Sequence, residues 1–227
     1  MFHENMIRRD YFIRMVQELT QALTRMVFFR KAQNYPHAIQ EFKRALSRFW
    51  NLTPEQIGNF SIEQWIEKCR EEEGPMGEKL VALADLFKEQ GEIEGAAEQA
   101  EIGLRSSTIA LGLYLEAVTS PDTIISVDLL GKIEELIERT SGSRLPAEVL
   151  RRLLSYYETR GMLDKAEDVL FDWLDTRDPA APKAGLSFYT RLETRTDQEL
   201  ERCGLPRAEV EEGREEVRRM TNDQITQ

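Results

Sequence analysis

The sequence predicts an all-α fold, and three observations lead to that prediction. Residues 6–35 contain neither Gly nor Pro, and their apolar side chains recur every three or four positions, as on one face of a helix. Signals that start helices then follow at regular intervals along the chain. No segment shows the two-residue alternation of apolar and polar side chains that is typical of a half-buried strand.

The first predicted helix spans residues 6–35 and carries more apolar side chains than one buried face requires. Its main stripe consists of Ile7, Tyr11, Met15, Leu19, Leu23, Met26 and Phe29. The apolar side chains outside that stripe are Phe12, Val16, Val27 and Phe28. Either the following helices of the same chain or a second copy of the protein could bury this surplus. Self-association as a homodimer through this helix is therefore one hypothesis, with the side chains outside the stripe as its contacts.

The next helices are predicted from their start signals. A helix begins near Pro36, and its inner stripe consists of Ile39, Phe42, Ala45, Leu46 and Phe49. Capping boxes at residues 53–56 and 61–64 predict two more starts, because in each box the first and fourth residues satisfy each other's backbone donors. Ser120-Pro121 and Pro146 predict further starts, since a proline in the first turn of a helix removes no hydrogen bond.

Breaks between helices are predicted at residues 73–75, 141–143 and 178–182, which are rich in Gly, Ser and Pro. The last break is the predicted domain boundary, between a helical-repeat body at residues 1–178 and a helical extension at residues 179–227. The extension contains a predicted helix near residues 183–192, a capping box at residues 196–199 and a charged helix after Pro206. The last six or so residues are expected to be disordered.

The stretch SYYETRGMLDKAEDVLFDWL (residues 155–174) has the pattern of two helices joined by a short turn. Gly161 supplies a left-handed helix end, where a Cβ atom would be unfavourable, and Ala166 is small where the two helices approach most closely. Together with Leu150, Leu153, Leu154, Tyr157, Leu163 and Leu170, these residues resemble the tetratricopeptide repeat (TPR). The resemblance implies antiparallel helix pairs stacked as a short TPR-like α-solenoid.

Two further segments resemble the same repeat more weakly. In residues 22–50, Gln33-Asn34 takes the place of glycine at the turn. In residues 76–118 the turn lies either at Gly91 or at Glu98-Gln99-Ala100, after a first helix that continues to about Ala97. We prefer the second register, because it avoids one very long second helix and places Ala110 and Leu111 at the small-large pair of the repeat.

The opening MIRRDYFIRMVQELTQAL, together with GLPRAEVEEG at residues 204–213, also resembles a family of uncharacterised bacterial proteins with this helical architecture. The resemblance covers most of the chain. It implies a fold, and it implies no activity that could be assigned to particular residues.

The charge of the chain is unevenly distributed. The net charge over 227 residues is −11, yet residues 1–50 hold nine basic and four acidic side chains. Residues 51–227 therefore carry a net charge of −16, which excludes wrapping of nucleic acid by this part of the chain, since neutralising phosphates needs a basic surface. The basic segment meets either acidic side chains of its own chain or of a second copy, or an external anionic partner.

Composition also predicts where the protein resides. No apolar run approaches the roughly 18 residues that a spanning helix needs, and the N-terminus lacks the pattern of a secretion signal. The two cysteines, Cys69 and Cys203, belong to no paired motif and suit a reducing compartment. We expect a cytoplasmic protein.

Neither catalytic nor metal-binding chemistry is predicted. His3 and His37 match no metal-ligand spacing, and Cys69 and Cys203 have no partner base in the sequence. Paired glutamates such as Glu134-Glu135 lie in charged segments that are expected to be solvated, and no glycine-rich phosphate loop occurs. The aromatic side chains at core spacing are Phe28, Phe29, Trp50, Trp65, Tyr156 and Tyr157. We therefore expect no cofactor, no metal and no enzymatic activity.

The leading functional hypothesis is a non-catalytic scaffold that binds a peptide or partner helix in a helical-repeat groove. The predicted groove-facing residues are Thr20, Val27, Arg30 and Lys31 in the first repeat and Glu148, Arg151, Ser155, Glu158 and Thr159 in the last. Each of them could equally be merely exposed to solvent. The matched Lys and Asn positions with which some of these repeats grip a C-terminal carboxylate are not found. The alternatives are the homodimer, a membrane-surface role of the basic N-terminal helix, and an enzyme with a buried carboxylate pair.

Overall fold

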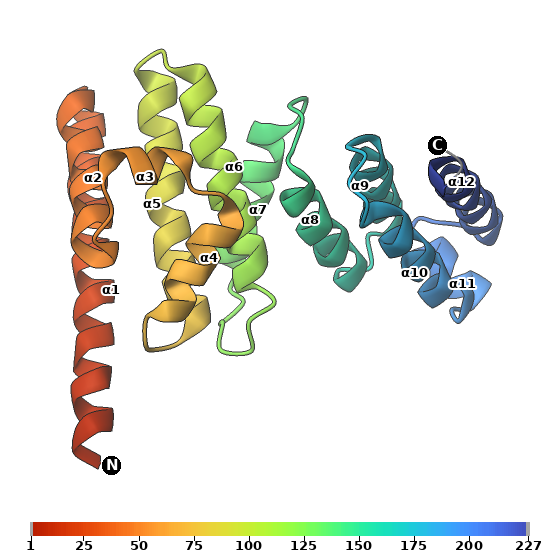
Figure 1. The fold of residues 1–227 in the computed structure, drawn as a ribbon, viewed down its shortest axis with the longest axis horizontal. Coiled ribbons are helices and arrows are strands. Elements are labelled where there is room, and N and C mark those ends of the chain that lie inside the picture. Colours follow the sequence, from red (N-terminus) through yellow and green to blue (C-terminus); the bar gives the residue numbers. More distant parts are fainter. Residues whose placement is uncertain (1, 226–227) are drawn as a thin grey trace. The chain divides into compact units, whose positions relative to one another are not determined.

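The computed structural model describes the backbone of residues 2–225 and the side chains of residues 13–53 and 55–221 (Figure 1). The described chain is helical and contains no strand, so the all-α prediction is confirmed. The helices are α1 (Phe2–Lys31), α2 (Tyr35–Trp50), α3 (Pro54–Asn59), α4 (Ile62–Glu71), α5 (Met76–Ala96), α6 (Ala100–Ala117), α7 (Val127–Thr140), α8 (Ala147–Thr159), α9 (Leu163–Asp175), α10 (Ala181–Glu193), α11 (Asp197–Arg202) and α12 (Arg207–Ile225).

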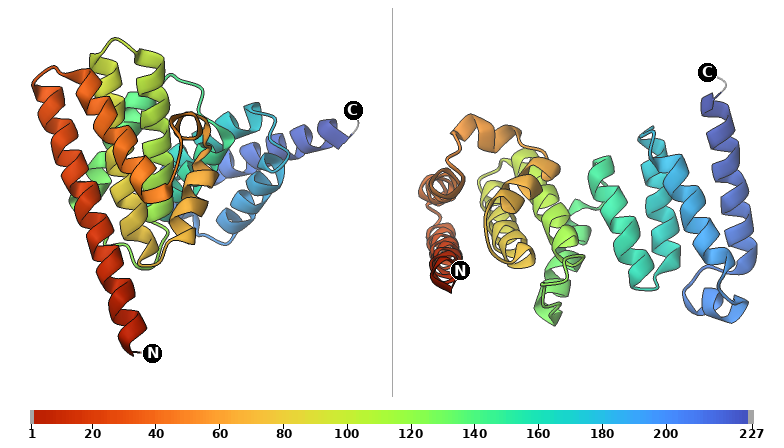
Figure 2. Two further views of the ribbon diagram at one scale, coloured as in Figure 1. Left: turned by 60° about the vertical axis from the view of Figure 1, so that its left-hand side comes forward. Right: turned by 60° about the horizontal axis from the view of Figure 1, so that its bottom comes forward.

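Helices that follow one another in sequence pack together as pairs. The most extensive of these contacts join α1 to α2, α5 to α6 and α8 to α9. Figure 2 shows α1, α2, α5 and α6 running alongside one another. The paired packing agrees with the solenoid-like architecture that the sequence predicts.

Contacts divide the chain into two compact units, unit 1 at Met1–Arg144 and unit 2 at Leu145–Gln227. The break predicted at residues 178–182 lies inside unit 2, between α9 and α10, and these two helices are in contact.

Three side chains of the main stripe of α1 are buried in unit 1. Met15, Leu19 and Met26 are each at most 2% exposed, and α1 contacts both α2 and α5. Ion pairs also join the basic N-terminal segment to carboxylates of the same chain, at Arg25–Glu41 (2.6 Å) and Arg30–Glu89 (2.6 Å). This part of the main stripe therefore belongs to the core of its own chain.

The predicted capping boxes are present at all three positions. At the start of α3, the hydroxyl of Thr53 accepts a hydrogen bond from the N–H of Gln56 (3.3 Å), and the side chain of Gln56 accepts one from the N–H of Thr53 (2.8 Å). The boxes at residues 61–64 and 196–199 have the same reciprocal pattern and start α4 and α11. These starts are determined locally, so sequence was sufficient to find them.

The helix start predicted at Ser120-Pro121 is wrong. Residues 118–126 form a loop, and α7 begins at Val127, where the hydroxyl of Ser126 accepts a hydrogen bond from the N–H of Leu129 (3.1 Å). The loop is instead held against the start of α5, because the carboxylate of Asp122 accepts a hydrogen bond from the N–H of Gly77 (3.0 Å). Pro146 is the N-cap of α8 and precedes its first turn.

The preferred register of the middle helix pair is confirmed. The first helix of the pair, α5, continues to Ala96, and Glu98 has the left-handed backbone conformation of the turn (φ +62°). Gly91 lies inside α5, where a Cβ atom would approach the hydroxyl of Ser107 to 2.5 Å and the carbonyl oxygen of Gly103 to 3.0 Å. Gly91 therefore permits the close approach of α6 and does not form a turn.

An aromatic cluster fills the centre of unit 1. Trp65 is fully buried and lies beside Phe87, with ring centroids 5.1 Å apart, and Phe87 contacts Phe42 edge to face at 5.2 Å. Trp50 joins the cluster, as its core spacing predicts. Phe28 is the exception among the aromatic residues assigned to the core, because its side chain is 66% exposed.

Unit 2 consists of α8 to α12. Gly161 has a positive φ of +69° at the turn between α8 and α9, and Ala166 is fully buried, both as predicted. The extension helices also form where they were predicted, and α12 packs on α10 with Val210 and Val217 buried. The helix continues to Ile225; the disorder expected for the last six or so residues concerns residues 222–227, which lie outside the described side chains.

Candidate functional site: an apolar groove with an acidic rim in unit 1

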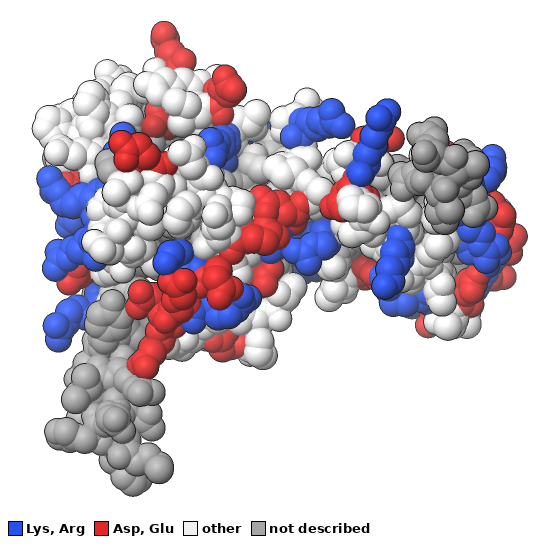
Figure 3. Space-filling view, viewed as in Figure 1, with Lys and Arg blue, Asp and Glu red and all other residues white. Residues whose placement is uncertain are grey.

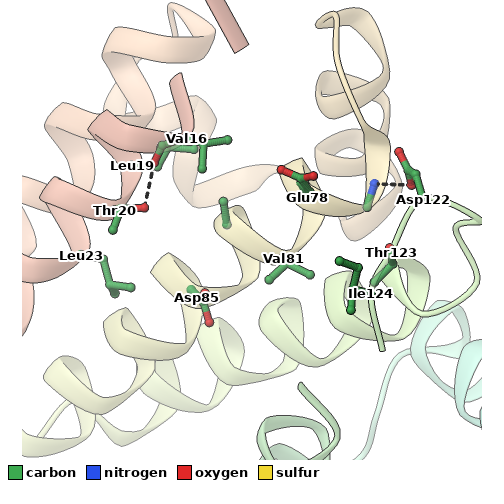
Figure 4. Close-up of a pocket in the computed structure, with 12 residues that line it drawn as sticks. Val16, Leu19, Thr20, Leu23, Glu78, Val81, Asp85, Asp122, Thr123 and Ile124 are labelled. Atoms are coloured by element: carbon green, nitrogen blue, oxygen red, sulfur yellow. Dashed lines mark hydrogen bonds between the residues drawn. The ribbon is translucent and has the colours of Figure 1, made fainter. Parts of the chain in front are cut away.

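A groove opens between α1, the first half of α5 and the α6–α7 loop (residues 118–126), and we call it the docking groove. Its cavity has a volume of about 300 Å³. Figure 4 shows its side chains converging from these three segments. The lining residues are Val16, Leu19, Thr20 and Leu23 of α1, Gly77, Glu78, Val81, Ala82 and Asp85 of α5, and Asp122, Thr123 and Ile124 of the loop.

The α1 wall combines Leu19 and Leu23 of the main stripe with Val16 and Thr20 beside them. Val16, Thr20, Leu23 and Val27 recur at three and four positions, and the first three line the groove. The hydroxyl of Thr20 donates a hydrogen bond to the carbonyl oxygen of Val16 (2.8 Å), which satisfies its donor within the helix. Val16 and Leu23 are half-buried, so this wall remains partly open.

The α6–α7 loop closes on the start of α5 because residue 77 has no side chain. A Cβ atom on Gly77 would overlap the side chains of Asp122 and Thr123. Hydrogen bonds from the hydroxyl of Ser120 and from backbone N–H groups, including that of Gly77, lower the pKa of Asp122. Asp122 therefore stays ionised and holds the loop beside the groove.

The groove carries carboxylates at its edge. Glu78 is exposed and forms no ion pair with the side chains that the structure describes. Asp85 pairs with Lys132 (2.8 Å) and accepts a hydrogen bond from the hydroxyl of Tyr114. Burial, followed by the neighbouring Asp85, raises the pKa of Tyr114, so this hydroxyl stays protonated as a donor. Glu78 and Asp122 therefore remain as negative charges that α7 does not neutralise.

The loop also presents large apolar side chains to solvent. Ile124 and Val127 are each 88% exposed and Ile125 is 55% exposed. Three exposed aliphatic side chains thus lie within four residues next to the groove, and exposed apolar patches commonly mark interaction surfaces. Sequence reasoning missed this patch because it assigned the segment to a helix; the apolar run TIISV after a Ser-Pro turn was the available signal.

Some of the unit 1 residues predicted to bind a partner or to self-associate line the groove, and others lie elsewhere. Thr20, predicted to bind a partner, and Val16, predicted for self-association, lie together in the groove. Val27 is half-buried and lies further along the same stripe, while Lys31 is exposed at the end of α1. Phe12 lies outside the described side chains, and Phe28 packs its exposed ring edge to face against Phe29 at 5.5 Å.

Arg30, predicted to face the groove, forms ion pairs within unit 1. Its guanidinium pairs with Glu89 (2.6 Å) and Glu92 (2.8 Å) of α5. The hydrogen bond to Glu89 is the largest cause that raises the pKa of Arg30. The residue therefore joins α1 to α5 as part of the structure.

The predicted groove residues of unit 2 lie on α8. Arg151, Ser155 and Thr159 are exposed and Glu148 is half-buried. Glu158 receives two hydrogen bonds from Arg191 of α10, each 2.7 Å long. Glu158 therefore connects two helices of unit 2 and is not an unpaired groove side chain.

Charge gathers unevenly over unit 1. Figure 3 shows acidic side chains over α4 and the segment after it, and basic side chains along the edge formed by α1 and α2. The acidic residues of α4 are Glu63, Glu67 and Glu71, and the basic residues of α2 are Lys43, Arg44 and Arg48. The basic N-terminal region therefore remains distinct from an acidic neighbouring surface.

Cys69 is fully buried beside Lys79. Burial raises the pKa of the Cys69 thiol to about 12, so the thiol is protonated at neutral pH and is a poor nucleophile. Among the described residues, no three His, Cys, Asp or Glu side chains are grouped so that they could hold a metal ion. No helix in this part of the chain is both long enough and apolar enough to cross a membrane.

Comparison with known proteins gives one family match. The profile of a family described as "Family of unknown function (DUF6483)" matches residues 6–222. No curated protein and no solved structure matches the chain.

Proposed function

This chain belongs to the DUF6483 family, and we propose that it is a non-catalytic protein-interaction scaffold. Its docking groove accepts a basic amphipathic segment of a partner protein. The observation that carries the proposal is the apolar loop of Ile124, Ile125 and Val127 beside a groove rimmed by carboxylates.

Apolar contact provides the affinity of this site. Burying exposed aliphatic side chains contributes about 25 cal/mol for each Å² of apolar surface removed from water. The exposed loop and the half-open α1 stripe would cover two sides of a bound helix, whose anchors recur at three and four positions. Together they offer more apolar surface than an isolated exposed side chain would.

Charge provides the preference for a basic partner. Glu78 and Asp122 lie at the groove, and the chain as a whole carries a net charge of −11. Complementary charge mainly accelerates association and rejects partners of the wrong sign. A segment that alternates Lys or Arg with Leu or Ile would match the rim and the apolar walls at once.

The helix pairs are proposed to be TPR-like repeats. In the α8–α9 pair, Gly161 occupies the left-handed turn and the buried Ala166 lies where the two helices meet. In the α5–α6 pair, Ala110 and Leu111 are both fully buried at the positions expected for the small-large pair. Repeats of this kind commonly present grooves to partners without catalysing a reaction.

The scaffold is proposed to work in the cytoplasm. Cys69 and Cys203 are both free thiols, which suits a reducing compartment. The protonated state of the buried Cys69 thiol supports a role without covalent catalysis.

The test is binding of two labelled model peptides, an amphipathic Leu/Lys helix and a Leu/Glu helix of the same pattern, measured by fluorescence anisotropy. The Leu/Lys peptide is expected to bind at least about tenfold more tightly, because only its charge complements the rim. The double variant Ile124→Ser/Val127→Ser should weaken that binding about tenfold, while Ile102→Ser, which removes an exposed aliphatic side chain from α6, should not. Equal weakening by both variants would mean that the peptide binds non-specifically to exposed apolar side chains, and would reject the groove.

A second candidate function is the homodimer through α1, and the exposure of Phe28 favours it. Phe28 is 66% exposed and Ile13 is 41% exposed on the same helix. Deleting the helix would remove core residues such as Met26, so a surface variant is the better test. Light scattering should show a dimer for the natural chain and a monomer for Phe28→Asp; a monomeric natural chain rejects this candidate.

A further inference from the structure

A second cavity in unit 1 lies between α2, α3, the second half of α5 and α6, and we call it the basic-mouthed cavity. Its volume is about 470 Å³, within the range of about 300–1,000 Å³ that small-ligand pockets occupy. It shares no lining residue with the docking groove. The cavity is therefore a site distinct from the docking groove.

The walls of the basic-mouthed cavity are apolar. Phe42 of α2, Ile57 of α3, Phe87 of α5 and Ile109 of α6 line it, and each of these side chains is buried by its neighbours. Four helices thus provide aliphatic and aromatic surface around one space. Such walls favour a hydrocarbon body over a polar one.

Two cations lie at the cavity without ion-pair partners. Lys43 and Arg105 line it and are exposed, and neither is within ion-pair distance of a carboxylate among the described side chains. In contrast, Arg25, Arg30 and Arg44 of the same region all pair with carboxylates. In a chain with a net charge of −11, two unpaired cations beside one apolar cavity are a specific arrangement that suits an anionic group.

The polar floor of the cavity is formed by Gln90, Glu94 and Ser106, which are all buried. The side-chain amide of Gln90 donates a hydrogen bond to one oxygen of Glu94. The second oxygen of Glu94 and the amide oxygen of Gln90 have no partner. Two buried acceptors in adjacent turns of one helix are unfavourable while the carboxyl group is ionised.

A proton on Glu94 resolves both unsatisfied acceptors. Burial raises the pKa of Glu94, partly offset by the hydrogen bond from Gln90 and by the positive charge of Lys43. A protonated carboxyl group could pair with the amide of Gln90 through two hydrogen bonds, one in each direction. The floor is then neutral, and the charges at the cavity are the two cations. Even with Glu94 ionised, these three groups sum to a positive charge.

We propose that the basic-mouthed cavity binds a small amphipathic carboxylate, whose hydrocarbon body lies between Phe42, Phe87 and Ile109 and whose carboxylate pairs with Lys43 and Arg105. The hydroxyl of Ser106, which forms no hydrogen bond within the described chain, is a further donor for the ligand. The apolar walls and the basic mouth match the two ends of such a molecule.

The experiment compares octanoate, octylamine and octanol, which share a chain length and differ in the charge of the head group, by isothermal titration calorimetry with the full chain. Octanoate is expected to bind saturably at one site, with a dissociation constant of about 1 mM or below for a ligand of this size. Octylamine and octanol should bind at least about tenfold more weakly, because neither pairs with the two cations. Equal binding of octylamine or octanol, or no saturable octanoate binding, overturns the proposal.

Variants of the two cations complete the test. Lys43→Ala and Arg105→Ala should each weaken octanoate binding about fivefold, as expected for a partly exposed ion pair. Lys43→Arg should retain binding, since it keeps the charge. Lys183→Ala, which removes an exposed lysine from unit 2, is the matched control and should change nothing. Because all three positions are exposed, the variants are expected to fold; an equal loss in the Lys183 variant would also overturn the proposal.

Discussion

The docking groove and the basic-mouthed cavity are lined by the two halves of the same helix, α5, and the halves differ in how far they are enclosed. The first half meets the groove with Gly77, Glu78, Val81, Ala82 and Asp85. In the second half, most side chains from Phe87 to Glu94 are buried, polar ones included, and the last two residues of the helix are exposed. One helix thus contributes an exposed acidic edge to the groove and a buried polar floor to the cavity. The two sites differ in the part of α5 that lines them: residues 77–85 line the groove, and residues 87–94 line the cavity.

The difference predicts that substitutions around the enclosed half of α5 will change stability strongly, whereas substitutions at the groove will not. Gly103→Ala is expected to have the largest effect. Its Cβ atom would approach the carbonyl oxygen of Gly91 to 2.9 Å and the N–H of Gly95 to 3.0 Å, and backbone atoms cannot rotate away. The free energy of unfolding should fall by about 1–3 kcal/mol.

Urea denaturation measures this change, and Gly95→Ala is its control. A Cβ atom at Gly95 meets nothing within 4 Å, so alanine should leave stability unchanged or raise it by up to about 1 kcal/mol. Equal effects of the two alanines would mean that α5 and α6 are not in close contact at this crossing.

Removal of the Arg30 guanidinium should have the next largest effect. Arg30→Ala leaves the buried Glu89 carboxylate without its partner, and the free energy of unfolding at neutral pH should fall by about 2 kcal/mol. Burial already raises the pKa of Glu89, and Arg30 lowers it, so the variant raises this pKa further. The loss should therefore shrink as the pH falls through the pKa of Glu89 in the folded variant and this carboxyl group takes up a proton.

The matched variant is Arg48→Ala, whose side chain forms an exposed ion pair with Glu18 at 3.1 Å. Exposed pairs contribute at most about 1 kcal/mol, and their loss should show no comparable recovery in acid. Thermal melts between acidic and neutral pH separate the two cases. A pH-independent loss for Arg30→Ala would contradict the burial of an ionised Glu89.

A substitution at the floor of the cavity is expected to increase the free energy of unfolding, by a smaller amount. The pKa of Glu94 is raised in the folded protein, so its ionised form destabilises the protein increasingly as the pH rises above the ordinary glutamate value of 4.5. Glu94→Gln should therefore stabilise the protein at neutral pH by about 1 kcal/mol and give no gain well below that value. Glu134→Gln on the exposed surface of α7 should show neither behaviour.

The smallest effect on stability is expected at the groove loop. Ile124→Ser/Val127→Ser should change the free energy of unfolding by less than about 0.5 kcal/mol for each residue, because both side chains are already exposed. The same variant is expected to lose peptide binding. A large loss of stability would instead show that the loop packs into unit 1 and is not available to a partner.

Local features of the fold were predictable from sequence because the interacting groups lie within a few residues. The box formed by Thr53 and Gln56 and the positive φ of Gly161 are examples. The loop before α7 was not, since its position depends on the hydrogen bond between Asp122 and Gly77, 45 residues apart. The proline of Ser120-Pro121 is compatible with both a helix start and a turn, and sequence alone could not choose between them.

The candidate site was predictable only in part, for the same reason. Val16 and Thr20 were singled out on different grounds, and the structure brings them together because they are four residues apart on one helix. Arg30 and Glu158 were expected to face a groove, but their partners Glu89 and Arg191 are 59 and 33 residues away. Predicting these two ion pairs would have required knowing which helices pack together.

The two cysteines are natural probes of local opening, one in each unit. Cys69 is fully buried in unit 1, and Cys203 is half-buried in unit 2. A thiol reagent can modify Cys69 only when the structure around it opens, so the labelling rate reports the frequency of that opening. Labelling of Cys203 follows a separate event in the other unit. Mass spectrometry of the natural chain can therefore measure how often each unit opens, without any introduced probe. Adding octanoate or a peptide would show whether a bound ligand slows this opening.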